Sequence, residues 1–144
     1  MEIKLLQIRE TTDEKLDSAS VIADFLREEG KADRECFWVL HLDTQLQLIS
    51  KELVSLGCLD STTVHPREVF KGAILDSAAT IITVHNHPGG GLTPSKEDIA
   101  IWNRLREAGE IIGIEVIDNL IITPAGKFFS ERASPLLKRP RGRR

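Results

Sequence analysis

The sequence of 144 residues lacks several features that mark whole classes of protein. Its longest apolar runs, such as residues 78–84, are far shorter than the ~20 residues that cross a membrane. The first residues show no charged-then-apolar signal peptide. The only two cysteines, Cys36 and Cys58, have no Cys-x-x-Cys partner. We therefore expect a cytoplasmic protein whose two thiols are reduced and lie in the core.

Positive charge is also scarce, except at one end of the chain. The sequence has 19 Lys and Arg against 22 Asp and Glu, but five of the basic residues lie in Lys138–Arg144. Residues 1–137 therefore carry a net charge of −8, within a total of −3. An acidic body argues against a broad nucleic-acid-binding face. The basic tail, which we expect to be disordered, could make weak and salt-dependent contact with nucleic acid.

The length and the 41% hydrophobic content suit one globular domain. Periodicity and turn residues predict helices from Ser18 or Ser20 to Glu29, from His65 onward, and from Ser95 to Ala108, before Gly109. The predicted strands cover residues 36–42, 47–55, 80–84, 114–117, 120–123 and 128–129. Residues 85–94 are predicted as a loop, and Asp118-Asn119 as a turn.

This order of elements predicts an α/β (α+β) fold, in which a single mixed β-sheet is flanked by helices. The strand at residues 47–55 could lie at an exposed edge of that sheet. A homodimer could then form by pairing of this edge with its copy.

Metal-binding side chains gather between the end of one predicted strand and the start of the next helix. In an extended segment, residues two apart point the same way, so His85 and His87 can converge on one ion. Asp98 returns from the first helical turn after a glycine-rich loop, and Ser95 lies within reach. Imidazole and carboxylate are the ligands of a catalytic zinc that keeps one position open for water. Taken alone, Ser95-x-x-Asp98 also fits a helix-capping box, but the combination favours a metal site.

The spacing His85-x-His87-x7-Ser95-x2-Asp98 resembles the motif of the JAMM (MPN/JAB) zinc metalloproteases. Over roughly residues 18–130 the chain also resembles the RadC-like branch of that family. The blocks that carry this likeness are His65-Pro-Arg-Glu-Val-Phe70, His85-Asn-His-Pro88, Pro94-Ser-x-Glu-Asp98 and Gly113-Ile-x-Val-x-Asp118. Two residues depart from the pattern: Gly89 stands in place of a serine and Asn119 in place of a histidine. We expect Gly89 to affect the loop over the cleft and Asn119 to affect the rim of the cleft.

The resemblance implies a JAB/MPN (cytidine deaminase-like) architecture. It divides the chain into an N-terminal extension at residues 1–17, a RadC-like JAB/MPN domain at 18–133 and the basic tail at 134–144. The helix-hairpin-helix DNA-binding segment that often precedes this domain in RadC proteins has no room in such a division.

The resemblance also implies a reaction. One zinc ion per chain, with an activated water as its fourth ligand, would cleave a peptide or isopeptide bond. The metal ligands would be His85, His87 and Asp98, and Ser95 would stabilise the oxyanion.

A glutamate would take the proton from the attacking water and pass it to the leaving amine. The family places this residue at the start of the first strand after the first helix, and Glu35 stands at that point. Glu52, on the returning strand, and Glu68, in a helix, are the alternatives.

Three functions follow from these features. The first is a zinc-dependent peptidase or isopeptidase that acts on a peptide or an isopeptide-linked protein. The second is a RadC-type DNA-repair-associated protein or a metal-dependent nuclease, which the basic tail favours and the acidic body opposes. The third is a metal-holding interaction module without turnover, although such family members usually lack the ligands that are present here.

Overall fold

The computed structural model describes residues 15–57 and 64–134 of the chain. Most of the predicted N-terminal extension, Cys58 and nearly all of the basic tail lie outside the described residues. The helices are α1 (Ala19–Phe25), the short 3₁₀ helix η1 (Glu29–Lys31), α2 (Pro66–Leu75) and α3 (Lys96–Ile112). The strands are β1 (Cys36–Leu42), β2 (Leu48–Leu56), β3 (Thr80–Asn86), β4 (Glu115–Ile122) and β5 (Phe128–Ser130). None of the described helices is long and apolar enough to cross a membrane.

The described strands form one mixed sheet in the order β2-β1-β3-β4-β5. β1 pairs antiparallel with both β2 and β3, β3 pairs parallel with β4, and β5 pairs antiparallel with β4. α3 connects the two parallel strands, which need such a crossover because both run in the same direction. The prediction of a single mixed sheet flanked by helices is confirmed. β2 lies at an edge of this sheet, as the predicted homodimer would require, while the dimer itself stays a prediction.

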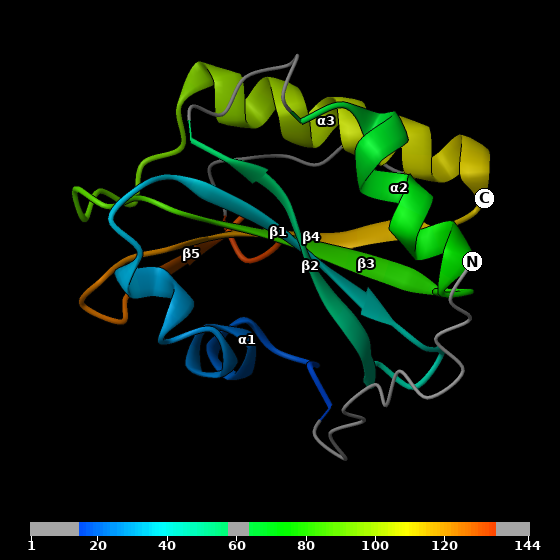
Figure 1. Ribbon diagram of the computed structural model, residues 1–144, viewed down its shortest axis with the longest axis horizontal. Helices are drawn as coiled ribbons and strands as arrows, with labels where there is room; N and C mark the ends of the chain where they lie inside the picture. The colour runs from blue at the N-terminus through cyan, green and yellow to red at the C-terminus, as the bar shows by residue number, and fades with distance from the viewer. Residues whose placement is uncertain (1–14, 58–63, 135–144) are drawn as a thin grey trace, which may run out of the picture.

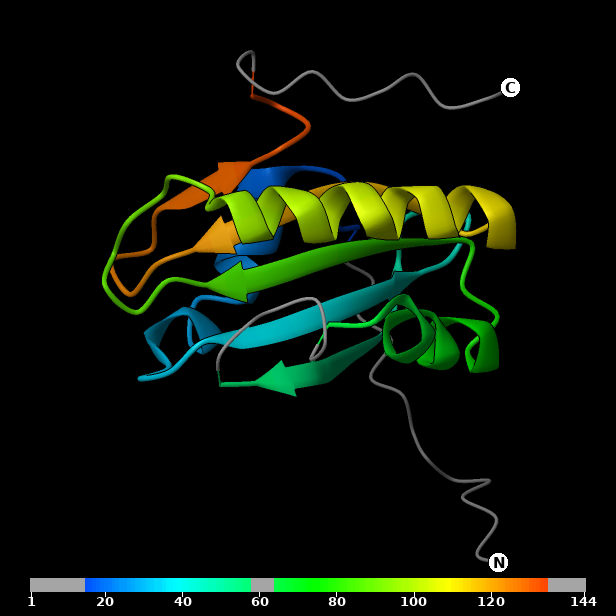
Figure 2. The same cartoon turned by 90° about the horizontal axis from the view of Figure 1, so that it is seen from above.

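Helices cover both faces of the sheet. Figure 1 shows α2 and α3 over one face and α1 on the other, and Figure 2 shows α3 lying along β3 and β4. All residues of β1 are buried, because its side chains alternate between two cores. The core on the α1 face includes Leu26, Trp38, Leu40, Val84 and Leu120. The core on the α2 and α3 face includes Phe37, Val39, Phe70, Ile81 and Leu105.

The last turn of α3 differs from its prediction. The helix does not end before Gly109 but continues to Ile112. A Cβ atom at Gly109 would lie 2.5 Å from the carbonyl oxygen of Ile114, so glycine is needed there for close packing rather than for termination. Gly113 ends the helix instead, in the left-handed conformation with φ of 87° that favours glycine.

The predicted turn at Asp118-Asn119 is wrong, since both residues lie inside the continuous strand β4. Asp118 is tolerated there because its carboxylate accepts hydrogen bonds from Ser130 Oγ (2.6 Å) and the Arg132 amide (3.1 Å). Asn119 is fully buried and accepts a hydrogen bond from Thr83 Oγ1, and its effect on the rim of the cleft stays a prediction.

Two further boundaries differ. α1 begins after the predicted cap Ser18, whose side chain accepts a hydrogen bond from the Val21 amide, but it ends early at Phe25. β3 runs two residues further than predicted and therefore includes His85 and Asn86. His85 is thus held by the sheet, and not by a loop.

Candidate metal centre

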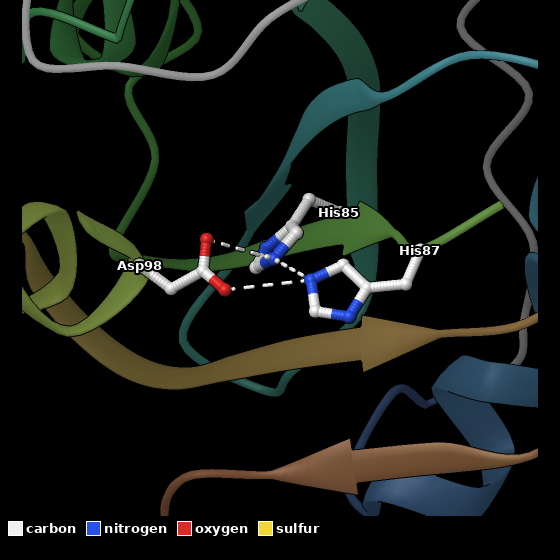
Figure 3. Close-up of side chains that lie close together, drawn as sticks. All are labelled: His85, His87 and Asp98. Carbon is white, nitrogen blue, oxygen red and sulfur yellow. Dashed lines mark hydrogen bonds and ion pairs between the residues drawn. The ribbon is translucent and has the colours of Figure 1, made fainter. Parts of the chain in front are cut away.

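The end of β3 and the first turn of α3 bring three metal-binding side chains together. His85 is the sixth residue of β3, His87 follows the strand directly, and Asp98 is at the third position of α3. Figure 3 shows the two rings and the carboxylate pointing toward one another. The two Nε2 atoms are 3.1 Å apart, and Asp98 Oδ1 and Oδ2 lie 3.3 Å from His85 Nε2 and 3.4 Å from His87 Nε2.

This arrangement fits a single tetrahedral metal ion. Ligand atoms placed about 2.0–2.1 Å from zinc at the corners of a tetrahedron lie about 3.3–3.4 Å from one another. The two Nε2 atoms, 3.1 Å apart, are close to that value, and each of them lies 3.3–3.4 Å from a different oxygen of the Asp98 carboxylate. Within the described residues, these three side chains are the group that could hold a metal ion, with all donor atoms within 4.8 Å of each other. The prediction that they converge is confirmed, and the identity of the metal stays a prediction.

The two histidine rings are oriented in different ways. His87 Nδ1 lies 2.7 Å from the carbonyl oxygen of Gly91 and can donate to it, which leaves the Nε2 lone pair free for a metal ion. The glycine-rich loop therefore orients the His87 ring through a backbone carbonyl group. His85 Nδ1 is buried and has no hydrogen-bond partner among the described residues. Its ring is positioned by packing, with Phe37 stacked at 6.2 Å and Trp102 tilted at 6.0 Å between ring centroids.

Asp98 also forms a helix-capping box with Ser95, which confirms that interpretation of the pair, while metal binding by Asp98 stays a prediction. Ser95 Oγ accepts a hydrogen bond from the Asp98 amide (3.0 Å), and Asp98 Oδ2 accepts one from the Ser95 amide (2.9 Å). The cap fixes the carboxylate at the start of α3, so that its two oxygens face the two histidines. Ser95 is exposed and its O–H can still donate. Its role at an oxyanion stays a prediction.

The charges of the cluster are strongly coupled. Burial raises the pKa of Asp98, but its hydrogen bonds with His85 and His87 outweigh burial and hold the pKa far below its usual value. The hydrogen bond with Asp98 raises the pKa of His87, and the nearby charge of Glu35 adds to this rise. Asp98 is therefore ionised across the physiological range, as a metal ligand must be.

Glu35 lies beside the cluster. In the pairing of β1 with β3, Phe37 is opposite His85, and continuing this register by two residues brings Glu35 opposite His87. Residues two apart share a face of the sheet, so Glu35 is expected on the face that carries both histidines. The effect of its charge on the pKa of His87 agrees with this position.

The two alternative glutamates lie elsewhere. Glu52 is opposite Val39 on β1, and its carboxylate packs against Gly72 of α2, where an added Cβ would be 2.3 Å from Oε2. Glu68 is exposed on α2, where its hydrogen bond with Lys71 lowers its pKa. Of the three candidates, Glu35 is the one whose charge affects the pKa of His87, and its role as the base stays a prediction.

Sequence reasoning missed two buried polar residues of the fold. Asn86, between the two histidines, is fully buried and binds the backbone around Glu35. Arg106, two turns after Asp98 on α3, forms a buried ion pair with Glu131. No signal in the sequence indicated the role of Asn86, because the predicted strand ended at residue 84 and left Asn86 in a predicted loop.

Comparisons with known proteins place these features in a family. The model of the RadC-like JAB domain family matches residues 16–136. A UPF0758 protein of Desulforamulus reducens is 53% identical over 105 residues, which cover 73% of this chain and 46% of the relative. A UPF0758 protein of Finegoldia magna is 49% identical over 107 residues, 74% of this chain and 48% of the relative. One from Thermotoga maritima is 43% identical over 115 residues, 80% of this chain and 52% of the relative. The chain spans about half the length of the curated relatives it matches. The sequence, the mixed sheet and the family match agree, and the chain belongs to the RadC-like JAB domain family.

Proposed function

We propose that this chain is a zinc-dependent metallohydrolase of the JAMM type that cleaves a peptide or isopeptide bond. The observation that carries the proposal is the convergence of two histidine nitrogens and one carboxylate, with one ligand atom of each within 4.8 Å of the others, beside the charge of Glu35. The donor set, two imidazoles and one carboxylate, is one that catalytic zinc sites use while a position stays open.

In this proposal each residue of the chain has a distinct task. When bound, zinc supplies Lewis-acid chemistry, which activates water near neutral pH and polarises a carbonyl group. His85, His87 and Asp98 hold the ion. Glu35 accepts the proton of the attacking water and delivers it to the leaving amine. The Ser95 hydroxyl donates a hydrogen bond to the carbonyl oxygen as negative charge develops on it.

The test measures zinc content and cleavage in the same preparations. The substrates are a library of quenched fluorescent peptides, lysine-isopeptide-linked peptides, and single- and double-stranded DNA and RNA. Glu35→Gln should retain zinc and lose about 10²–10⁴-fold in the rate of amide cleavage, the usual contribution of a general base. Glu52→Gln and Glu68→Gln are matched controls, because they remove the same charge away from the cluster, and both should stay active.

Two outcomes would contradict the proposal in different ways. A fully active Glu35→Gln protein with normal zinc content would remove the base assignment. Cleavage of nucleic acid that is lost in Asp98→Ala, without any cleavage of peptides, would favour the metal-dependent nuclease. The acidic body, with its net charge of −8 over residues 1–137, disfavours that second function.

A further inference from the structure

Asn86 lies between the two histidine ligands but takes no part in the cluster. Strand alternation turns its side chain to the opposite face of β3 from His85. There it is completely buried, with 0% of its surface exposed. A buried amide is stabilising only if its donors and acceptor are bonded, so its partners indicate what it does.

The partners of Asn86 all belong to the short segment that carries Glu35. Asn86 Oδ1 accepts a hydrogen bond from the Cys36 amide at 2.7 Å. Asn86 Nδ2 donates to the carbonyl oxygens of Arg34 at 2.9 Å and Ala32 at 3.3 Å. The side chain therefore binds the backbone immediately before and immediately after Glu35.

These bonds join the segment to β3, with which its backbone does not pair, whereas Cys36 pairs with Leu56 of β2 on the other side. The pairing of β1 with β3 begins at Phe37, one residue after the Cys36 amide that Asn86 binds. On the other side, the carbonyl oxygen of Glu35 accepts a hydrogen bond from the Gly57 amide at 2.7 Å, just beyond β2. Glu35 is thus fixed through its backbone, and Asn86 provides the bonds from the strand that bears the histidines.

We propose that Asn86 is a positioning residue that ties the Glu35 segment to the ligand strand, so that the carboxylate of Glu35 stays in register with the metal centre. This inference rests on the proposed function, in which Glu35 transfers the proton. A side chain that joins the Glu35 segment to β3 would keep the distance between the Glu35 carboxylate and the two histidines constant when the surrounding loops move. A shift of about 1 Å at such a distance is enough to slow proton transfer strongly.

The hydrogen bonds from Asn86 to the Glu35 segment, called the tether below, can be tested without an activity assay, because Cys36 lies within that segment. Its amide is bonded to Asn86, its Sγ lies 3.5 Å from the carbonyl oxygen of Arg34, and its side chain is buried. The probe is iodoacetamide labelling of Cys36, followed by mass spectrometry in a Cys58→Ser background. Asn86→Leu, which has the same number and branching of side-chain heavy atoms but no hydrogen bonds, should raise the labelling rate about tenfold or more.

Thr83→Val is the matched control. Thr83 is on the same strand and is equally buried. The substitution also removes a side-chain hydrogen bond, here to Asn119, but Thr83 does not touch the Glu35 segment. Its labelling rate should stay near that of the parent protein. If the Asn86→Leu protein does not fold, Asn86→Asp serves instead, since it keeps the acceptor for the Cys36 amide and loses both donors. Equal labelling in the Asn86 variant and in Thr83→Val would overturn the tether.

The catalytic consequence is measured on the best peptide from the library. Asn86→Leu should lower kcat by about 10–100-fold while KM changes little and one zinc per chain is retained, because only the proton-transfer geometry is lost. Faster labelling with unchanged kcat would make Asn86 a structural residue and overturn the positioning role. If Glu35→Gln is itself fully active, Glu35 is not the general base of the proposed function. The labelling experiment still decides whether the tether exists.

Discussion

Replacing Asp98 by asparagine separates its two roles, as metal ligand and as part of the helix cap. In the structure Oδ2 accepts a hydrogen bond from the Ser95 amide at 2.9 Å, while Oδ1 lies 3.3 Å from His85 Nε2. The amide oxygen of the Asp98→Asn side chain can keep the bond to Ser95. Its NH₂ group then takes the place of Oδ1 and presents hydrogens to the metal position. The cap survives, while the negative charge that faces both histidines is lost together with the oxygen nearest to His85.

The expected magnitudes follow from these contacts. Removing only an outer partner of a metal ligand costs about 10–100-fold in affinity, so Asp98→Asn should weaken zinc binding by at least about 100-fold, or about 3 kcal/mol. At a pH above the raised pKa of His87, where that ring is neutral, the metal-free unfolding temperature of this variant should change little. Asp98→Ala should lose zinc to a similar extent and also about 1 kcal/mol of helix capping, which lowers the metal-free unfolding temperature by a few degrees.

The assay is zinc competition against a chromophoric chelator, with thermal unfolding of the metal-free proteins beside it. Glu97→Gln is the matched control, because Glu97 lies in the same first turn of α3, is exposed and carries the same charge. That variant should bind zinc as the parent does. If Asp98→Asn bound zinc as tightly as the parent protein, Asp98 would be a capping residue alone and the assignment of the metal centre would be refuted.

Two further predictions concern pH and the tail. The hydrogen bond with Asp98 raises the pKa of His87 above its ordinary 6.5. The stability that this bond gives the metal-free protein is therefore present at low pH and is lost as the pH rises through the raised pKa. Zinc requires the deprotonated ring, so the increase in unfolding temperature on adding zinc should grow between about pH 5.5 and about pH 8; an increase that does not depend on pH would contradict this coupling. We also propose that Lys138–Arg144 makes weak contact with nucleic acid. Deleting residues 135–144 should leave zinc binding and hydrolysis intact and reduce salt-sensitive binding to heparin, whereas a loss of hydrolysis would place the tail in the site.

The convergence of His85, His87 and Asp98 could be predicted from the sequence because their positions depend on local rules. Residues two apart in an extended segment face the same way, and a capping box fixes the first turn of a helix. The Ser95-x-x-Asp98 pattern appeared to offer a choice between cap and metal site. The structure has the capping box and also directs the carboxylate at both histidines.

What could not be predicted depends on contacts between distant segments. Gly109 is typical of a helix end in the sequence, yet it lies within α3 because the backbone at Ile114 approaches it closely. Asp118 is typical of a turn, yet Ser130 and Arg132 provide the bonds that allow it inside β4. The partners of Asn86 are about fifty residues away along the chain, so no local pattern could indicate them.

The most direct test of the metal centre is a crystal structure of the zinc-soaked protein with anomalous difference density at the zinc edge. The account predicts one peak per chain, about 2.0–2.2 Å from His85 Nε2, His87 Nε2 and an oxygen of Asp98, with Glu35 beside the open position. A chain that binds zinc stoichiometrically at other residues, or shows no peak at this cluster, would contradict it.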